Sequence, residues 1–121
     1  MRELSKLKVW EKAQEFGLDI YAITKSFPKE EIYRIANQIR RAAVSIPNNI
    51  AEGCGRKSKK ELSDFLNIAM GSASEVEYLL LLSYDLHYLK DKYQMLNENL
   101  IEIRKMLNVF MQKIKTDINE N

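Results

Sequence analysis

His87 and Cys54, the only histidine and the only cysteine of the chain, are the residues best suited to nucleophilic or metal chemistry. Nucleophilic catalysis requires a base that accepts the proton of the nucleophile. The histidine, however, lies more than thirty positions from the cysteine. One histidine and one cysteine do not complete a zinc site, and no HExxH or CxxC pattern is present. We therefore predict a partly buried or interfacial histidine, no metal and no cofactor.

Two other patterns also fail to indicate an enzyme. The glycine pair in "EGCGRK" does not match a phosphate-binding loop, because GxxxxGK[ST] is absent and no strand precedes it. Glu75 and Glu77 are two positions apart, so a helix places them on different faces. We expect no catalytic residue and no small-molecule substrate.

Positive charge is concentrated in the first half of the chain. Residues 1–61 contain 13 Lys and Arg against 8 Asp and Glu, whereas residues 62–121 contain 6 against 9. The excess comes largely from Arg40, Arg41, Arg56, Lys57, Lys59 and Lys60. This clustering favours a polyanionic partner. The alternative is a solvated basic loop that keeps the protein soluble.

The stretch "SIPNNIAEGCGRKSKKE", residues 45–61, interrupts an otherwise helical pattern. Pro47 has no N–H group for the carbonyl of Ala43, so the helix is expected to kink or restart there. The polar side chains beside it that can bond freed backbone groups are Ser45, Asn48 and Asn49. Gly53, after Glu52, is a candidate left-handed helix terminator.

The elements that must position these residues are four amphipathic helices. Apolar residues recur every three or four positions over about 7–27, 29–52, 59–89 and 92–116. Ser58, followed by Glu61, predicts a capping box at the start of the third. Four helices with short connections predict an all-α, antiparallel up-down-up-down four-helix bundle, with its second helix kinked near Pro47. The whole chain, 1–121, is expected to be one domain.

The third helix carries more apolar residues than one core requires. One stripe consists of Leu62, Leu66, Ala69, Ala73, Val76, Leu80 and Ser83, and a second of Phe65, Ile68, Leu79, Leu82, Leu86 and Leu89. They converge at "EYLLLLSY". A helix that is apolar nearly all round is buried on more than one side. This predicts self-association through Tyr78, Leu79, Leu81 and Leu82; the alternative is an internal helix of a thicker bundle.

Composition agrees with a helical protein of a reducing compartment. The 121 residues include only 4 Gly and 2 Pro, which is too few for the turns of an all-β fold. A single cysteine cannot form an internal disulfide. The N-terminus has no apolar stretch of signal-peptide length, and the longest apolar run, 78–82, is far too short to span a bilayer. We expect a cytoplasmic protein without a membrane partner.

The segment "QIRRAAVSIPNNIAEGCGRKSKKELSDFLNIAMGSASEVEYLL", residues 38–80, closely resembles a bacterial four-helix bundle family. The family was named for proteins encoded within intervening sequences of 23S ribosomal RNA genes. The upstream "LKVWEKAQEF" and "FPKEEIYRIANQIRRA" match its opening, so the resemblance covers about 4–115. It implies up-down bundles that assemble into ring-shaped homopentamers. The name describes where some of the genes lie and implies no activity.

A related branch, the accessory proteins of diversity-generating retroelements, forms similar pentamers and is thought to bind nucleic acid and a reverse transcriptase. Those relatives are strongly basic, whereas this chain has a net charge of only +2. The motif positions carried onto this chain are Arg40, Arg41, Ser45, Pro47, Asn49, Glu52, Gly53 and Arg56, none with a known catalytic role. In one account Asn49 bonds backbone freed by the proline and Glu52 pairs with Arg41 or Arg56. In the other, these residues border a phosphate-binding surface formed with the neighbouring lysines.

The leading hypothesis is a non-enzymatic, homo-oligomeric and pentameric bundle that acts as a scaffold or adaptor linked to RNA or DNA. Five copies of "RKSKK" around a ring would offer many weak phosphate contacts at once. The alternative is a protein–protein interaction module with no nucleic-acid role. An enzyme with a site shared between subunits, containing Glu52 and His87, is a distant third.

Overall fold

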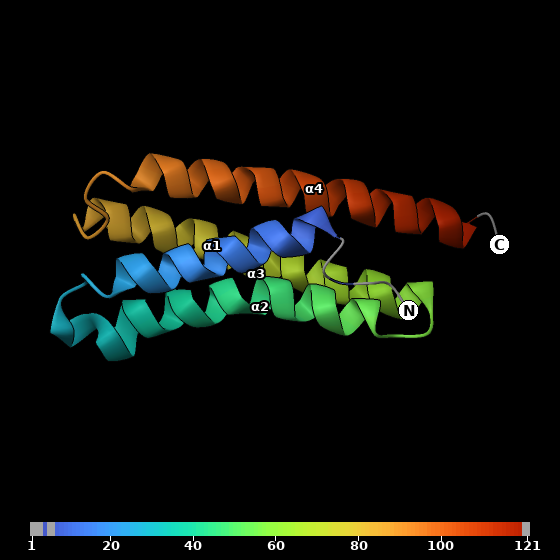
Figure 1. The fold of residues 1–121 in the computed structure, drawn as a ribbon, viewed down its shortest axis with the longest axis horizontal. Coiled ribbons are helices and arrows are strands. Elements are labelled where there is room, and N and C mark those ends of the chain that lie inside the picture. The colour runs from blue at the N-terminus through green and yellow to red at the C-terminus, as the bar shows by residue number, and fades with distance from the viewer. Residues whose placement is uncertain (1–3, 5–6, 120–121) are drawn as a thin grey trace.

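The computed structural model describes residue 4 and residues 7–119. Four α-helices lie side by side in an elongated bundle (Figure 1). They are α1 (Lys8–Thr24), α2 (Asn37–Cys54), α3 (Lys59–Asp85) and α4 (Tyr93–Asn119). The α1–α2 and α3–α4 connections lie at one end, and the α2–α3 turn lies at the other with the end of α4. The predicted four-helix bundle is confirmed.

The core consists of the stripes predicted from helical spacing. Every member of the first α3 stripe, including Leu80 and Ser83, is buried. The facing stripes of α1 and α4 contribute Val9, Ala13, Phe16, Ile20, Leu96, Leu100, Ile103, Leu107 and Ile114. Between α2 and α3 the buried residues include Ala42, Ala43, Ala69 and Ala73. Small side chains at these positions let the two helices approach closely.

The connection between α1 and α2 differs from the prediction. The expected helix over 29–52 is instead a 3₁₀ turn (Lys29–Glu31), a π-helical turn (Ile32–Ala36) and then α2. Pro28 is extended, with ψ at 144°, and Arg34 is non-helical, with φ −120° and ψ −109°. Regular α-helix therefore begins only at Asn37, and α1 ends at Thr24 rather than near 27.

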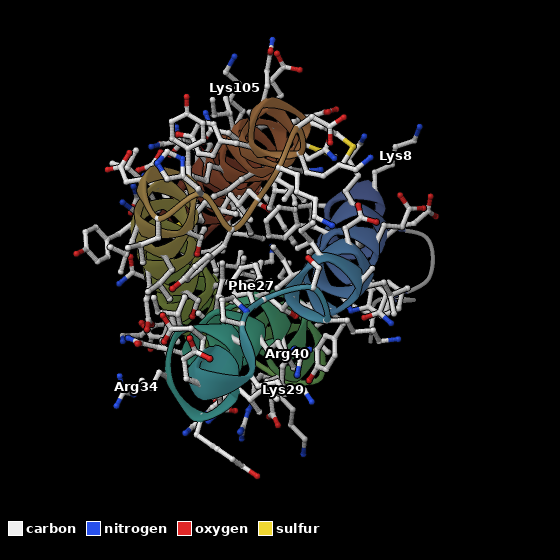
Figure 2. All side chains as sticks on the ribbon, turned by 90° about the vertical axis from the view of Figure 1, so that its left-hand side faces the viewer. Lys8, Phe27, Lys29, Arg34, Arg40 and Lys105 are labelled. Carbon is white, nitrogen blue, oxygen red and sulfur yellow. The ribbon has the colours of Figure 1, made fainter. Side chains whose placement is uncertain are left out.

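A tyrosine joins the two connections at this end of the bundle. Tyr88 donates a hydrogen bond of 2.8 Å from Oη to Oε2 of Glu31, and its ring lies 5.2 Å from that of Phe27. Phe27 points into the bundle (Figure 2). The hydrogen bond to the carboxylate is the main reason why the pKa of Tyr88 is raised. The phenol therefore stays protonated as a donor, and its contribution to stability is complete below the ordinary tyrosine pKa and is lost as pH rises through the raised pKa.

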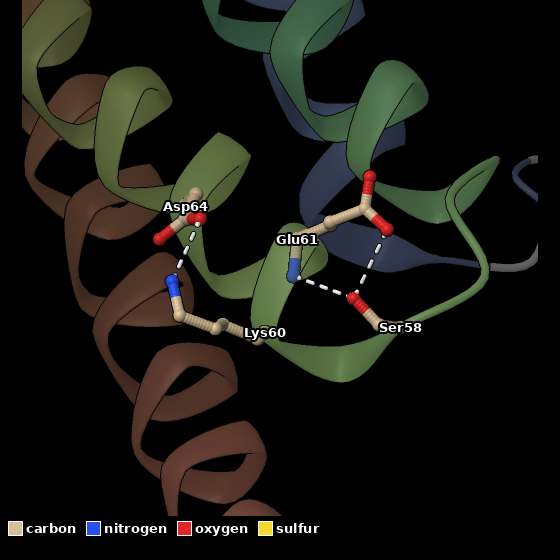
Figure 3. Close-up of polar contacts among 4 residues, drawn as sticks. All are labelled: Ser58, Lys60, Glu61 and Asp64. Atoms are coloured by element: carbon tan, nitrogen blue, oxygen red, sulfur yellow. Dashed lines mark hydrogen bonds and ion pairs between the residues drawn. The ribbon is translucent and has the colours of Figure 1, made fainter.

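The N-cap bond of the capping box predicted for α3 is present, and the Glu61 carboxylate accepts from the Ser58 hydroxyl rather than from its backbone N–H. The backbone N–H of Glu61 donates to Oγ of Ser58 at 3.1 Å, and that hydroxyl donates to Oε1 of Glu61 at 3.1 Å (Figure 3). Ser58 is extended, as expected for an N-cap. By length and composition alone α3 is apolar enough to cross a membrane, and a core helix of a bundle satisfies the same criterion.

The other end of α3 is closed by a residue in the left-handed region. His87 has φ 65°, and the N–H groups of His87 and Tyr88 donate to the carbonyls of Tyr84 and Ser83, both at 2.9 Å. This pair of bonds is a Schellman motif, in which glycine is the usual left-handed residue. His87 is exposed on this loop, so it is not partly buried within the chain, and the alternative of an interfacial histidine stays a prediction.

Replacing His87 with glycine is expected to stabilise the protein by about 0.5–1 kcal/mol. Glycine removes the steric cost of the left-handed conformation, and part of the gain is offset by its greater freedom in the unfolded chain. Urea unfolding measures the change. As a control, Leu86→Gly alters the preceding residue, where φ is −85°, and should destabilise. Equal effects of both substitutions would contradict a specific role for the left-handed position.

Gly53 does not terminate α2 in the left-handed region, and that prediction is wrong. No glycine in the described part of the chain has positive φ, and the helix continues to Cys54. A Cβ atom on Gly53 would lie 2.9 Å from Cδ1 of Leu62, 3.0 Å from Cβ of Phe65 and 3.3 Å from the Leu62 carbonyl. Glycine is present because α3 passes close to the α2 backbone here.

Gly53→Ala and Gly71→Ala are expected to change stability in opposite directions. At Gly53 the new methyl group meets the Cβ of Phe65 and backbone, which cannot rotate away, so about 1–3 kcal/mol is lost to overpacking. At Gly71, inside α3, a Cβ meets nothing within 4 Å, so alanine should add about 0.5–1 kcal/mol. Denaturant midpoints measure both, and stabilisation by Gly53→Ala would contradict the close approach.

Candidate functional site

The α2 helix continues through Pro47 without ending or restarting. Beside the proline, Nδ2 of Asn49 donates to the carbonyl of Ser45 at 2.7 Å and to its Oγ at 2.9 Å. That hydroxyl is 2.8 Å from Oγ of Ser72 on α3. Pro47 leaves the carbonyl of Ala43 without its usual donor. Asn49 does not donate to that carbonyl but to the carbonyl of Ser45. These polar contacts connect α2 to α3.

Four motif residues lie along one face of α2 at steps of four, four and three, namely Arg41, Ser45, Asn49 and Glu52, and Arg56 follows in the turn after the helix. Glu52 and Arg56 are four positions apart. They form an ion pair, with Oε2 of Glu52 3.4 Å from NH2 of Arg56. The guanidinium of Arg56 also lies 4.9 Å from the ring centre of Phe65 on α3. Of the two partners expected for Glu52, the structure shows Arg56. Half-exposed pairs of this kind stabilise little, so their main effect is to orient the side chains.

Arg40 lies about 100° around α2 from Arg41 and contacts α1. Its Nε donates to Oγ1 of Thr24 at 2.6 Å, and its guanidinium is 5.1 Å from the ring centre of Tyr21. Figure 2 shows Arg40 on the α1 side of the bundle and Arg34 on the other side. Arg40 thus connects α2 to α1, whereas Arg41, the next residue, lies on the side of α2 that faces α3.

The basic turn, residues 56–60, is balanced by nearby carboxylates. Nζ of Lys59 lies 3.6 Å from Oδ2 of Asp117, and Nζ of Lys60 lies 3.4 Å from Oδ2 of Asp64 (Figure 3). Lys57 is exposed and has no ion-pair partner among the described residues. Arg41 lies near the start of α2 and Arg56 beyond its end at Cys54, and the helix between Arg41 and Cys54 alone is about 20 Å long at about 1.5 Å per residue. The six predicted basic residues therefore do not form one patch.

The interface residues predicted on α3 divide between surface and core. Tyr78 is 61% exposed, Leu81 is 45% exposed and Leu82 is half-buried. Leu79 is only 2% exposed, so its assignment to an interface is corrected. The spacing in the sequence already indicated that Leu79 is buried, because it lies three residues after buried Val76 and four before buried Ser83. The other three residues, at i, i+3 and i+4, form one outward patch, which we call the α3 outer face.

The two chemically reactive side chains lie at opposite ends of the bundle. Cys54 is buried at the end of α2, whereas His87 follows α3 at the other end (Figure 1). Within residues 7–119 no group of three or more His, Cys, Asp or Glu side chains could hold a metal ion.

Sequence reasoning missed a polar groove between the start of α2 and the middle of α3. Its volume is about 500 Å³. The side chains that line it include Tyr33, Arg34, Gln38, Arg41, Ser72 and Glu75. We call it the α2–α3 groove. One signal for it was present: Arg34 and Arg41 are seven positions apart, a spacing that places them on one side of a helix.

Comparisons with known proteins agree on the family. The family model described as 23S rRNA-intervening sequence protein matches residues 5–109. A crystal structure of a protein of unknown function of the S23 ribosomal protein family, from Bacteroides thetaiotaomicron, is 31% identical with a TM-score of 0.79. The match covers 86% of this chain and 95% of that one. The comparison with curated proteins gives no match. The chain therefore belongs to the 23S rRNA-intervening sequence protein family.

Proposed function

We propose that this protein is a non-enzymatic helical scaffold that self-associates through the α3 outer face. The observation that carries the proposal is the exposure of Tyr78 and Leu81 beside half-buried Leu82, on a helix whose other face fills the core. Aromatic and large aliphatic side chains grouped on a surface are typical of contact sites. Association would remove this apolar area from water, at about 25 cal/mol per Å².

A ring of five subunits is the expected assembly, on the strength of the family resemblance. Such a ring requires a heterologous contact, in which the α3 outer face meets a different surface of the next subunit. Light scattering on the purified protein measures the assembly mass. We expect a mass five times that of the 14.2 kDa chain, constant over a wide concentration range. A mass of one chain at all concentrations would overturn the proposal.

A nucleic-acid role at the basic turn is the second candidate. Two observations favour it: residues 55–61 are all exposed, and Lys57 forms no ion pair with a carboxylate in the described part of the chain. Competition from Asp64 and Asp117 for the neighbouring lysines weakens each phosphate contact. If the turn binds, affinity should fall steeply with salt, and Lys57, Lys59 and Lys60 changed together to Ala should flatten that slope. Binding no stronger than that of an acidic control protein would exclude this role.

A further inference from the structure

The α2–α3 groove has two cationic side chains that form no ion pair with any described residue. Arg34 and Arg41 are exposed and have no ion-pair partner in the described part of the chain. Arg40 and Arg56, by contrast, are held by Thr24 and Glu52. Arg34 lies in the π-helical turn and Arg41 near the start of α2, and both line the same groove. A guanidinium presents paired N–H donors that match a carboxylate, so this pair suits a ligand with two carboxylates.

The rest of the lining offers both donors and acceptors. Gln38 supplies an amide and Ser72 a hydroxyl, while Glu75 supplies a carboxylate from the α3 side. The main chain of an extended peptide carries N–H and C=O groups in alternation and needs such a mixed lining. A phosphate backbone has acceptors only and offers no donor to the Glu75 carboxylate, whereas a main-chain N–H of a peptide can donate to it. The groove chemistry therefore favours a peptide over a nucleic acid.

Tyr33 supplies an apolar contact beside the arginines. Its side chain is 90% exposed, the highest value among the large hydrophobic residues described. It precedes Arg34 in the π-helical turn and lines the same groove. Tyrosine and arginine are the residue types that, with tryptophan, dominate binding energy at protein interfaces.

We propose that the α2–α3 groove binds an extended acidic peptide segment of a partner protein. Two of its carboxylates pair with Arg34 and Arg41, and one of its side chains packs on Tyr33. An extended chain rises about 3.3 Å per residue, so acidic side chains a few positions apart on one peptide can reach different points along the groove. The site lies within one subunit, so it does not depend on self-association through the α3 outer face.

The test is selection of peptides from a phage-displayed library of random twelve-residue peptides on the purified full-length protein. We expect the selected peptides to be enriched in Asp and Glu two to four positions apart. The best synthetic peptide should bind the Arg34→Glu/Arg41→Glu variant at least ten-fold more weakly, as measured by fluorescence anisotropy. Tyr33→Ala should weaken binding as well, and Tyr33→Phe should restore most of it.

The matched control is Lys105→Glu/Lys115→Glu, which makes the same change of net charge on α4. Both lysines are exposed, and Lys105 lies far from Arg34 (Figure 2). This control should bind the peptide as the wild type does, and circular dichroism should show that all variants are folded.

The proposal is overturned if selected peptides lack acidic enrichment or bind the groove variant and the wild type equally. It is also overturned if a labelled single-stranded oligonucleotide binds through the same two arginines and displaces the peptide. Light scattering on the same samples reports self-association separately.

Discussion

Leu80→Asp is expected to destroy the cooperative fold. Leu80 has no exposed surface and lies in the α3 stripe that packs against the other helices. A carboxylate at this position would be buried without a partner, which costs several kcal/mol and places the variant among the most damaging single substitutions. For a domain of this size, a loss of about 4 kcal/mol lowers the melting temperature by about 20 °C. Thermal denaturation followed by circular dichroism measures this.

The control for Leu80→Asp is Val109→Asp on α4. Val109 is 71% exposed, so its replacement puts a carboxylate in water and should change the melting temperature by only a few degrees. A Leu80→Asp protein that melts like the wild type would mean that the assignment of the α3 stripe to the core is wrong.

The double change Tyr78→Glu/Leu81→Glu is expected to separate the assembly into single chains while the helices remain intact. Both side chains project from the bundle, so glutamate at these positions stays solvated in the isolated subunit. In an assembly the two carboxylates would be buried against a neighbouring subunit, where unpaired charges are strongly unfavourable. Light scattering should therefore give the mass of one chain, with an unchanged helical circular dichroism spectrum.

Val109→Glu serves as the matched control for this second prediction. It replaces an exposed apolar side chain with the same charge, but on the solvent side of α4. The assembly should retain its full mass. An unchanged mass for the Tyr78→Glu/Leu81→Glu protein would exclude the α3 outer face as the contact.

Helical periodicity predicted the architecture because the core stripes repeat every three or four residues. The same periodicity predicted that Leu80 is buried, and the capping box at Ser58 and Glu61 was visible as a spacing. These features depend on residues close in the sequence, so local patterns determine them.

Features that depend on how helices meet were predicted less well. Gly53 matched a helix terminator locally, but its role follows from the distance to Leu62 and Phe65 on the next helix. Arg40 and Arg41 belonged to one basic cluster in the sequence, yet Thr24 on α1 holds the first and the α2–α3 groove contains the second. Their separation by about 100° around a helix was available from the sequence, whereas their partners were not.

The irregular start of α2 was also outside local prediction. The residues 29–36 continued a helical pattern, and only the position of Pro28 indicated an interruption. The π-helical turn contributes Tyr33 and Arg34 to the groove that Arg41 also lines. The spacing of the two arginines was the sequence signal for it, whereas the part played by Tyr33, Ser72 and Glu75 follows from the tertiary structure.

Hydroxyl-radical footprinting of the tyrosines in solution tests most directly whether the α3 outer face is covered. Within one chain Tyr78 is 61% exposed and Tyr21 is 44% exposed, so an isolated subunit should be oxidised faster at Tyr78. We predict the reverse order in the wild-type protein, because a neighbouring subunit shields Tyr78 and leaves Tyr21 accessible. Faster oxidation of Tyr78 than of Tyr21, at a concentration where light scattering shows an assembly, would contradict the proposed contact.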